Sequence, residues 1–384
     1  MRVSHVITRL IVGGAQENTI ASVLGLRAKP DVEVQLISGP TAGPEGSLES
    51  QVSSVPGLLT VVPELVRPVS PLKDWLALRR LTSVFRETRP DIVHTHSGKA
   101  GVLGRLAAAR AVVPVIVHTI HGPSFGPFQG AVANFAFKSA EQYAARVTTH
   151  YVCVADAMTE QYLAAGIGRR EQYSRIFSGF DLAPFGVAKN DPVLRAKLGI
   201  APGAFVIGKI ARLFELKGHE DLFEIAPALL RARPQIKFLL VGDGALRGQF
   251  EQRARDLGVE KQFIFTGLVP PQEVPRYIGI MDTLVHLSRR EGLARALPQA
   301  LAAGKPVVAY DCDGAREVCL ENETGLLLRP GDRAGLSRAL EQLSQDRAFC
   351  ARLGRRGQAL VQERFPVGRM VDELHALYTR LLAR

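Results

Sequence analysis

The chain has 384 residues, of which 46% are hydrophobic and 22% are charged, a composition typical of folded globular proteins and not of disordered or collagen-like ones. This length indicates about two domains. The sequence contains 48 Lys and Arg against 37 Asp and Glu, and the resulting net charge of +11 favours an anionic partner. Because the basic residues are spread along the chain and form no Arg-rich helix or tail, no nucleic-acid partner is predicted.

The sequence also indicates where in the cell the protein is expected. The first residues, MRVSHVITRL, have no small-residue cleavage site and predict a buried strand, not a signal peptide. No run approaches the ~18 apolar residues that a spanning helix needs. The four cysteines form no CxxC pair and have no His at metal-ligand spacing, so neither a zinc site nor a disulfide framework is predicted. We expect a cytoplasmic protein and leave open a peripheral contact with the inner face of an anionic membrane.

Short runs of Val, Ile and Leu alternate with amphipathic helical patterns along most of the chain, which is typical of parallel βαβ units. Two such runs predict an α/β protein with two doubly wound, Rossmann-like domains that face a cleft, and not a single eight-fold barrel. The expected strands are Val3–Ile7, Val32–Ile37, Leu59–Val62, Asp91–His94, Val115–Thr119, Tyr151–Val154 and Tyr173–Ile176 in the first half, and Phe205–Ala211, Lys237–Val241, Phe263–Phe265, Thr283–His286, Pro306–Ala309 and Gly325–Leu328 in the second.

A segment rich in Pro, Gly, Asp and Asn, Gly179–Lys197, separates the two runs. We therefore predict an N-terminal domain over residues 1–180 and a C-terminal domain over 181–366. The amphipathic helix Val367–Leu382 lies within residues 367–384 and either packs on its own domain or crosses back to the first. A second amphipathic segment, Asp74–Arg89, is expected to be core or domain surface in preference to a membrane contact.

The strongest local motif follows the strand that ends near His286. It begins with Glu291 and Gly292, whose missing side chain lets the backbone approach a ligand closely. Gln299 lies about two helical turns beyond Glu291, so the two side chains are expected to flank the same crevice. The intervening amides form the expected start of a helix near residues 294–295, whose positive end favours a diphosphate; they belong to Leu293, Ala294 and Arg295.

This passage resembles the nucleotide-sugar site of the GT-B glycosyltransferases of the large retaining family 4, whose signature is a Glu, seven residues and a second Glu. The resemblance implies that Glu291 contacts hydroxyls of the donor sugar and that the second acid hydrogen-bonds the nucleotide ribose. In this chain the second position is Gln299, a departure from the family pattern. An amide still offers a donor and an acceptor to ribose hydroxyls, so we expect binding at this position.

Two cations, Arg212 and Lys217, lie on the short loop between a predicted strand and the helix that follows Gly218. Fixed cations at this place could clamp two phosphates and neutralise the charge on a departing nucleoside diphosphate. The pair resembles the diphosphate grip of the same family. The alternative is two solvated basic residues on a loop.

Histidines cluster where predicted strands end. His94 and His118 alternate with apolar neighbours and are expected to be buried structural residues, whereas His96 and His121 are expected just past the strand ends. The resemblance implies that His121 reaches toward the donor sugar or the reaction centre.

Glycine-rich loops follow several strands. Gly13 and Gly14 come after the first strand, and the resemblance implies that this loop faces the donor phosphates and the acceptor. The GxGxxxG pattern of KFLLVGDGALRG suits a dinucleotide site, but the next strand carries no Asp or Glu for the ribose of NAD. The family resemblance instead implies that Gly267 and Leu268 lie close to the nucleotide base.

The sequence therefore predicts a retaining glycosyltransferase that moves a hexose-type sugar from a nucleoside-diphosphate sugar to a saccharide or lipid-linked acceptor, in cell-surface polysaccharide or glycolipid synthesis. Glu291, His121, Arg212 and Lys217 are the expected catalytic residues. We expect no metal requirement, since the nearest DxD-like pair, in residues 311–313, lies beyond the donor helix and the basic pair can take its role. Two alternatives stay open: a GT-B-type nucleotide-sugar epimerase and a non-catalytic nucleotide-sugar-binding protein.

Overall fold

The computed structural model describes residues 1–41, 46–126 and 128–384. The chain divides into two compact units: unit 1 comprises Met1–Phe180 together with Val367–Arg384, and unit 2 comprises Asp181–Pro366. Within the described ranges, no helix is both long enough and apolar enough to cross a bilayer.

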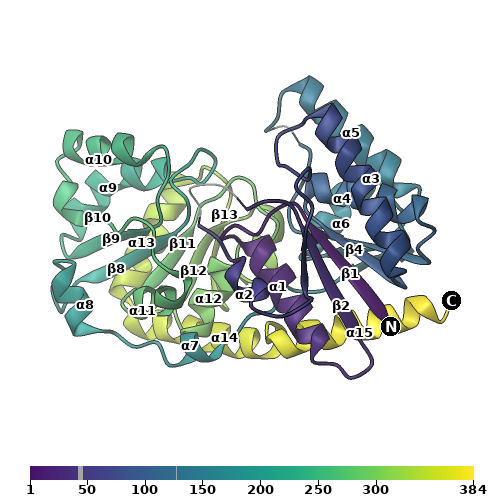
Figure 1. Ribbon diagram of the computed structural model, residues 1–384. Helices are drawn as coiled ribbons and strands as arrows, with labels where there is room; N and C mark the ends of the chain where they lie inside the picture. Colours follow the sequence, from purple (N-terminus) through teal and green to yellow (C-terminus); the bar gives the residue numbers. More distant parts are fainter. Residues whose placement is uncertain (42–45, 127) are drawn as a thin grey trace. The chain divides into compact units, whose positions relative to one another are not determined.

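Unit 1 is built around a seven-stranded parallel sheet with the strand order β3-β2-β1-β4-β5-β6-β7 (Figure 1). The order reverses at β1, since β2 and β3 lie on one side of it and β4 to β7 on the other. Every strand predicted for this half is present, with its ends within two residues of the predicted ones. The strands are β1 (Arg2–Ile7), β2 (Glu33–Ser38), β3 (Leu59–Val61), β4 (Ile92–His96), β5 (Val115–Ile120), β6 (His150–Cys153) and β7 (Tyr173–Arg175).

Helices cover both faces of this sheet. The apolar side chains of α1, α2 and α15 share one core with alternate residues of β1, β4 and β5, and those of α3 and α4 fill a second core on the other face. Because both faces are buried, the strands are near-continuous apolar runs. The helices are α1 (Gly14–Arg27), α2 (Ser50–Ser53), α3 (Pro71–Thr88), α4 (Gly98–Arg110), α5 (Ala131–Ala145), α6 (Asp156–Ala164), η1 (Arg170–Gln172) and α15 (Val367–Leu382).

The last helix, α15, packs against α1. A Cβ atom on Gly25 of α1 would come within 2.3 Å of the Val371 side chain, so the two helices approach at a glycine. The predicted apolar stripe of α15 is buried here, and its members are Met370, Leu374, Leu377, Tyr378 and Leu381. The end of the chain thus completes the core of unit 1.

Helix α3 is amphipathic as predicted, but it buries only part of its apolar face. Leu81 and Phe85 are buried, whereas Leu72, Trp75 and Leu76 are 68%, 51% and 37% exposed. The first two turns of α3 therefore present apolar side chains to solvent instead of to the core.

Unit 2 contains a six-stranded parallel sheet with the order β10-β9-β8-β11-β12-β13. Here the order reverses at β8, so β8 and β11 are neighbours although about 70 residues of chain separate them. All six predicted strands are present. They are β8 (Phe205–Ile210), β9 (Ile236–Val241), β10 (Phe263–Phe265), β11 (Thr283–His286), β12 (Val307–Tyr310) and β13 (Gly325–Leu328).

Stacked phenylalanine rings form the centre of the unit 2 core. The ring of Phe263 lies 4.5 Å from that of Phe238 and 4.4 Å from that of Phe223, centroid to centroid. The helices of this unit are α7 (Ala183–Gly186), α8 (Pro192–Lys197), α9 (Glu220–Ala232), α10 (Arg247–Asp256), η2 (Glu260–Gln262), η3 (Pro271–Glu273), α11 (Val274–Gly279), α12 (Ala296–Ala302), η4 (Asp313–Glu317), α13 (Arg333–Gln345) and α14 (Arg347–Arg364).

The GxGxxxG pattern has a packing explanation. A Cβ atom on Gly242 would lie 2.2 Å from the carbonyl oxygen of Ala211, and one on Gly244 would lie 2.4 Å from that of Leu213. These two glycines let the loop after β9 pass directly against the loop after β8. The pattern therefore serves contact between two loops.

One charged residue is buried in unit 2 without a hydrogen bond. Lys209 on β8 is 1% exposed, and its Nζ has no hydrogen-bond partner in the described part of the chain. Burial, with some repulsion from Lys217, lowers the pKa of the Lys209 amine from 10.5 to about 7. Because the unfolded chain holds this proton more tightly, the ammonium destabilises the fold most below pH 7 and ceases to do so above about pH 10.5.

We predict that Lys209→Met raises the free energy of unfolding at pH 6 by a few kcal/mol, since each unit of pKa shift corresponds to about 1.4 kcal/mol. The gain should shrink as the pH rises from 7 to 10. Urea unfolding at pH 6, 8 and 10 measures both effects. The matched control is Lys237→Met on β9, because the Lys237 ammonium donates to the Lys261 carbonyl at 2.6 Å. A gain of equal size at all three pH values would contradict the prediction.

Candidate functional site

Two loops of unit 2 meet where β8 and β11 end. The backbone N–H of Arg289, after β11, donates to the carbonyl of Leu216, after β8, at 2.8 Å. Gly218 permits this contact, since its φ is 67° and a Cβ there would lie 2.1 Å from the Leu287 carbonyl oxygen. In open α/β sheets ligands bind beyond the carboxyl ends of such strands, where the strand order reverses. The candidate site therefore lies at these two loops.

An ion pair joins the two loops through side chains. The Lys217 ammonium donates to Oε1 of Glu291, and both side chains are partly buried, at 18% and 27% exposure. The hydroxyl of Ser288 donates to the same oxygen at 3.2 Å, and the backbone N–H of Glu291 donates to Oδ2 of Asp313 at 2.6 Å. Glu291 is thereby held, at its carboxylate or its backbone, by residues that follow three different strands.

The charge state of Glu291 follows from its neighbours. Burial alone would raise the pKa of this carboxyl, but the positive charge and hydrogen bond of Lys217 outweigh it and hold the pKa below its ordinary value. His286, buried at the end of β11, has a pKa lowered to about 3 by burial and is neutral at pH 7. The site thus contains an ionised carboxylate beside a lysine and a neutral imidazole.

A buried carboxylate, Asp221, holds the loop after β11 in place through hydrogen bonds. Asp221 is fully buried and accepts hydrogen bonds from Arg289 at 3.1 Å, Arg333 at 2.8 Å and the Tyr310 hydroxyl at 2.9 Å. Burial alone would raise the pKa of Asp221, but these hydrogen bonds outweigh it and hold the pKa below its ordinary value, so the group stays ionised. Because Arg289 also bonds to Leu216 through its backbone, Asp221 helps to fix both loops.

The second predicted cation lies apart from this ion pair. Arg212 is exposed, and its guanidinium lies over the ring of Phe214, 5.1 Å from the ring centroid. Its carbonyl accepts a hydrogen bond from Nε2 of His219 at 3.1 Å. The structure therefore brings Lys217, but not Arg212, to Glu291.

The expected helix tip is displaced. Helix α12 begins at Ala296, one or two residues later than predicted, and has only seven residues, with Arg295 as its N-cap. The amides of Leu293 and Ala294 therefore precede the helix instead of forming its first turn. The carbonyl of Gly292 accepts a hydrogen bond from the backbone N–H of Gly314 at 2.9 Å, which holds this stretch in place before the helix starts.

The other predicted donor residues of unit 2 lie in three places. Gln299 is the fourth residue of α12 and is partly buried. Gly267 has φ 72°, and its carbonyl accepts the backbone N–H of Gly242 at 3.1 Å. Leu268, next to it, is 62% exposed.

Of the predicted unit 1 residues, Gly13 and Gly14 follow β1, where the strand order reverses, and His121 follows β5. Gly13 is the extended N-cap of α1 and Gly14 is its first residue. His121 follows β5 and is partly buried. His94 and His118 are 0% and 1% exposed, which confirms their expected burial.

The expectation for His96 was wrong. It is the last residue of β4 and is 1% exposed, not a residue past the strand end. The strand continues this far because His96 is still in register with Thr119 of β5.

Three residues that orient the site escaped the sequence interpretation: Ser288, Asp313 and Asp221. Asp313 was considered only as half of a metal-binding pair, whereas it binds the backbone of Glu291. The available signal was its position three residues after β12, the strand next to β11.

Family models match both units. The Glycosyl transferase 4-like domain matches residues 13–176, and the Glycosyl transferases group 1 family matches residues 190–360. The chain is a glycosyltransferase of the group 1, family 4 type. This agrees with the resemblance drawn from the motif around Glu291.

Named relatives of this glycosyltransferase include enzymes with different donors. It is 28% identical over 321 residues to the UDP-Gal:alpha-D-GlcNAc-diphosphoundecaprenol alpha-1,3-galactosyltransferase of Escherichia coli, covering 83% of this chain and 82% of that protein. It is also 28% identical over 312 residues to the GDP-mannose-dependent alpha-mannosyltransferase of Mycobacterium tuberculosis, covering 79% and 77% of the two chains.

Solved structures identify the fold of this glycosyltransferase as GT-B. The crystal structure of HepE from Anabaena in complex with UDP-glucose aligns with a TM-score of 0.83 at 24% sequence identity, covering 99% of this chain and 100% of that one. The predicted fold class, two Rossmann-like domains with parallel sheets, is therefore confirmed.

Proposed function

We propose that this glycosyltransferase moves a sugar from a nucleoside-diphosphate sugar to an acceptor hydroxyl, with retention of the anomeric configuration, in the synthesis of a cell-surface polysaccharide or glycolipid. The observation that carries the proposal is the Lys217–Glu291 ion pair where β8 and β11 end. The relatives named above, which use UDP-galactose and GDP-mannose, support a nucleoside-diphosphate donor without indicating which base or sugar.

In this proposal unit 2 holds the donor and unit 1 receives the acceptor. Lys217 and Arg212 bind the diphosphate, and Glu291 accepts hydrogen bonds from hydroxyls of the sugar. The Glu291 carboxylate suits that role because it is ionised and already oriented by Ser288 and Asp313. Gln299 binds the ribose through its amide in place of the usual carboxylate, and Gly267 and Leu268 lie against the base.

The bond from the anomeric carbon to the phosphate oxygen breaks as the acceptor oxygen bonds to the same carbon. The acceptor proton passes to the departing phosphate, whose negative charge is stabilised by the two cations. Lys217 and Ser288 bond to Oε1 of Glu291, and the ammonium stabilises the negative charge of the carboxylate, which lowers its reactivity as a nucleophile. We therefore propose a route with retention and without a covalent intermediate.

We also propose that no metal ion is needed for this transfer. The two carboxylates that most resemble a DxD metal-binding pair already accept hydrogen bonds. Asp311 accepts from the Arg316 guanidinium at 2.8 Å, and Asp313 accepts from the Glu291 backbone. The positive charge that a metal would supply comes from Lys217 and Arg212.

We predict that Lys217→Met and Glu291→Gln separate binding from turnover. Removing the cation should weaken the binding of UDP or GDP by about tenfold to a hundredfold, since a charge-assisted contact to phosphate is lost. Replacing the carboxylate by its isosteric amide should leave nucleoside-diphosphate affinity nearly unchanged and lower turnover by at least about a hundredfold. Calorimetry with a panel of nucleoside diphosphates, followed by donor turnover with and without EDTA, measures both.

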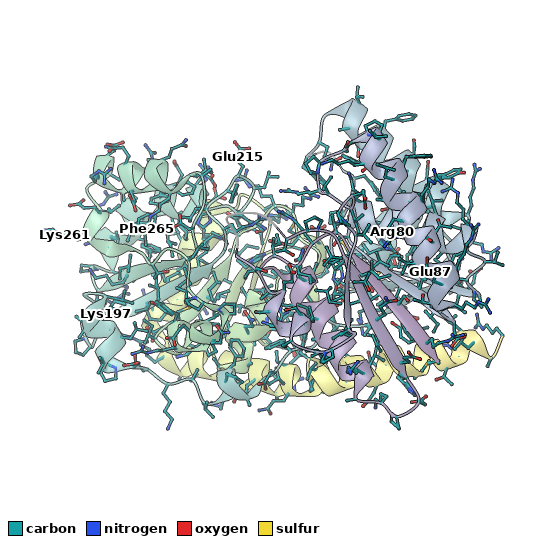
Figure 2. All side chains as sticks on the ribbon, viewed as in Figure 1. Arg80, Glu87, Lys197, Glu215, Lys261 and Phe265 are labelled. Atoms are coloured by element: carbon teal, nitrogen blue, oxygen red, sulfur yellow. The ribbon has the colours of Figure 1, made fainter. Side chains whose placement is uncertain are left out.

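The control for these variants is Lys261→Met, because Lys261 is an exposed lysine of η2, just before the edge strand β10 of unit 2 (Figure 2). It should behave as the unaltered protein does. If no nucleoside diphosphate or its sugar bound to the unaltered protein, the proposal would fail. Release of free sugar without transfer would indicate the epimerase alternative instead.

A separate prediction concerns the departure at Gln299. If the amide suffices for the ribose, Gln299→Glu should change the KM for the donor by no more than about threefold and leave kcat unchanged. A rise in turnover of tenfold or more would instead mean that the natural site is impaired. The test compares steady-state rates of the two proteins over a range of donor concentrations.

We propose in addition that the start of α3 contacts an anionic membrane, which would give a lipid-linked acceptor access to unit 1. Leu72, Trp75 and Leu76 are exposed there, and the neighbouring Lys73, Arg79 and Arg80 are exposed cations. Arg79 lies over the Trp75 ring, 4.8 Å from its centroid. Apolar side chains framed by cations suit the surface of an anionic bilayer.

We predict that the protein floats with vesicles that contain acidic phospholipid and not with neutral vesicles. The double substitution Leu72→Ser with Trp75→Ser should reduce this binding at least about fivefold. Val193→Ser, on an exposed apolar residue of α8, serves as the control. Equal binding of the double variant and the unaltered protein would refute a membrane contact through α3.

A further inference from the structure

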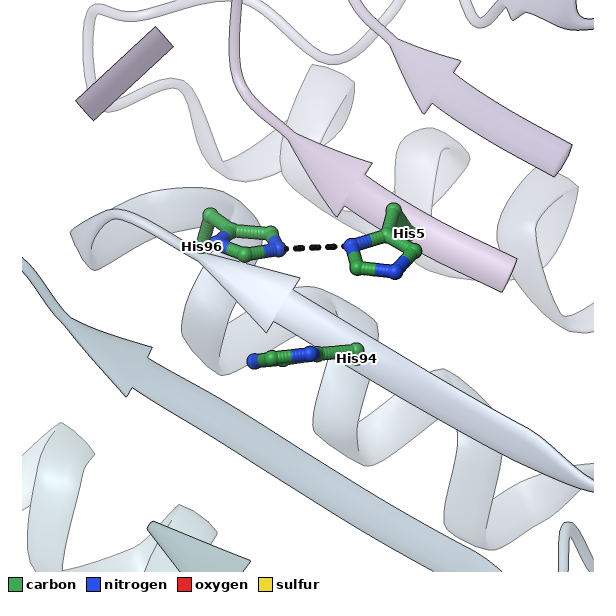
Figure 3. Close-up of side chains that lie close together, drawn as sticks. All are labelled: His5, His94 and His96. Atoms are coloured by element: carbon green, nitrogen blue, oxygen red, sulfur yellow. Dashed lines mark hydrogen bonds between the residues drawn. The ribbon is translucent and has the colours of Figure 1, made fainter. Parts of the chain in front are cut away.

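Unit 1 contains a cluster of buried imidazole rings beside the β1–β4 strand pair. The strand register sets His5 of β1 directly opposite His94 of β4, and His96 lies two residues further along β4 (Figure 3). Successive residues of a strand alternate between faces. His5, His94 and His96 therefore share the face of the sheet that α1 and α15 cover, and Thr119 and His121 continue this face along β5.

These rings form a continuous chain of hydrogen bonds that runs from His121 through Tyr378 of α15 to Thr119. All of its members except His121 are at most 3% exposed. The contacts are His121 Nε2 to His96 Nδ1 at 3.0 Å, His96 Nε2 to His5 Nδ1 at 2.9 Å, His5 Nε2 to Tyr378 Oη at 3.4 Å, Tyr378 Oη to His94 Nδ1, and His94 Nε2 to Thr119 Oγ1 at 2.6 Å.

Every ring of the chain is neutral at pH 7. Burial lowers the pKa of His5 and His121 to about 3, and it lowers the pKa of His94 and His96 well below the ordinary value. A neutral imidazole carries one N–H donor and one lone-pair acceptor. Since each of the three inner rings, His96, His5 and His94, uses one nitrogen on either side, all of the protons must point the same way along the chain.

The single proton of the Tyr378 hydroxyl decides between the two directions. If Tyr378 donates to His94, His5 donates to Tyr378 and each ring back to His121 follows, so that His121 carries its proton on Nε2. If Tyr378 donates to His5, every bond reverses and His121 carries its proton on Nδ1. The Tyr378–His94 contact is much shorter than the 3.4 Å contact to His5, which favours the first direction.

We propose that Tyr378, acting through His5 and His96, holds His121 in the Nε2–H tautomer, so that its Nδ1 presents a lone pair to a hydroxyl of the substrate. The contact between His121 and the substrate rests on the proposed transfer reaction and on the expectation that His121 reaches the reaction centre, whereas the tautomer does not. Tyr378, His5 and His96 are positioning residues in this arrangement. A lone pair at Nδ1 accepts a hydrogen bond from a sugar hydroxyl, and an N–H at that place does not.

A metal ion is the alternative occupant of this cluster. Nitrogen atoms of His5, His94 and His96 lie within 4.8 Å of one another, and no other cluster in the described residues could hold an ion with three such ligands. Both nitrogens of all three rings, however, already have hydrogen-bond partners. An ion would have to replace several of these bonds, so we favour the chain of hydrogen bonds.

The test uses the full-length protein labelled with ¹⁵N in its histidines, because long-range ¹H–¹⁵N spectra distinguish the two tautomers. Tyr378→Phe removes the acceptor of the His5 Nε2–H, and a buried N–H without a partner costs more than a buried lone pair. The proton of His5 should therefore move to Nδ1, which reverses the chain and converts His121 to the Nδ1–H tautomer.

Thr119→Val tests the same chain from its other end. It removes the acceptor of the His94 Nε2–H, so that His94 should donate to Tyr378 and Tyr378 to His5, with the same conversion of His121. Tyr151→Phe, a buried tyrosine of β6 outside the chain, is the control and should leave the His121 signals unchanged. If Tyr378→Phe is too unstable to study, the Thr119 variant carries the test.

The expected result is Nε2–H at His121 in the unaltered protein and Nδ1–H in both variants, with kcat reduced about tenfold and the donor KM little changed. An unchanged tautomer in both variants would overturn the proposal, as would stoichiometric metal in the purified protein. Conversion of the tautomer with full turnover would overturn the contact between His121 and substrate. Absence of transferase activity in the unaltered protein would instead count against the proposed function alone.

Discussion

The position of the Lys217–Glu291 ion pair depends on how two neighbouring strands leave their sheet. After β8 the chain builds β9 and β10 on one side, and after β11 it builds β12 and β13 on the other, so the two loops diverge over the carboxyl edge. The backbone bond between Leu216 and Arg289 then ties the loops together, and Asp221 fixes Arg289. Neither contact uses the charged groups of Lys217 and Glu291, so the loops are fixed independently of the ion pair.

The strands were predictable because both faces of each sheet are buried, and burial of both faces produces unbroken apolar runs that stand out in a sequence. Strand ends and helix starts were less predictable, since they depend on partners distant in the chain. His96 stays in β4 because Thr119 of β5 is in register with it. Helix α12 starts at Ala296, and the carbonyl of Gly292, four residues earlier, accepts from Gly314 instead of from a helical amide. Neither partner can be recognised from local spacing.

The site was predictable only where chemistry and position coincide in one short segment. Glu291 beside Gly292, and Lys217 beside Gly218, follow strands closely, and the structure brings the two side chains together in an ion pair. The supporting residues Ser288, Asp313 and Asp221 have side chains that point in directions which spacing does not reveal. Arg212 illustrates the opposite case, since it lies on the correct loop but stacks on Phe214 instead of meeting Glu291.

The buried rings of unit 1 show how a sheet core can contain polar groups at little cost. An unpaired imidazole nitrogen in this core would cost about 1–3 kcal/mol, but each ring between Thr119 and His121 has a partner for both of its nitrogens. Replacing one ring by an apolar residue would leave its two neighbours unpaired, so the members stabilise the fold as a set and not one by one. Because Tyr378 belongs to α15, this dependence links the last helix of the chain to a residue that follows β5. The link is one of hydrogen-bond direction, which packing between apolar side chains could not transmit.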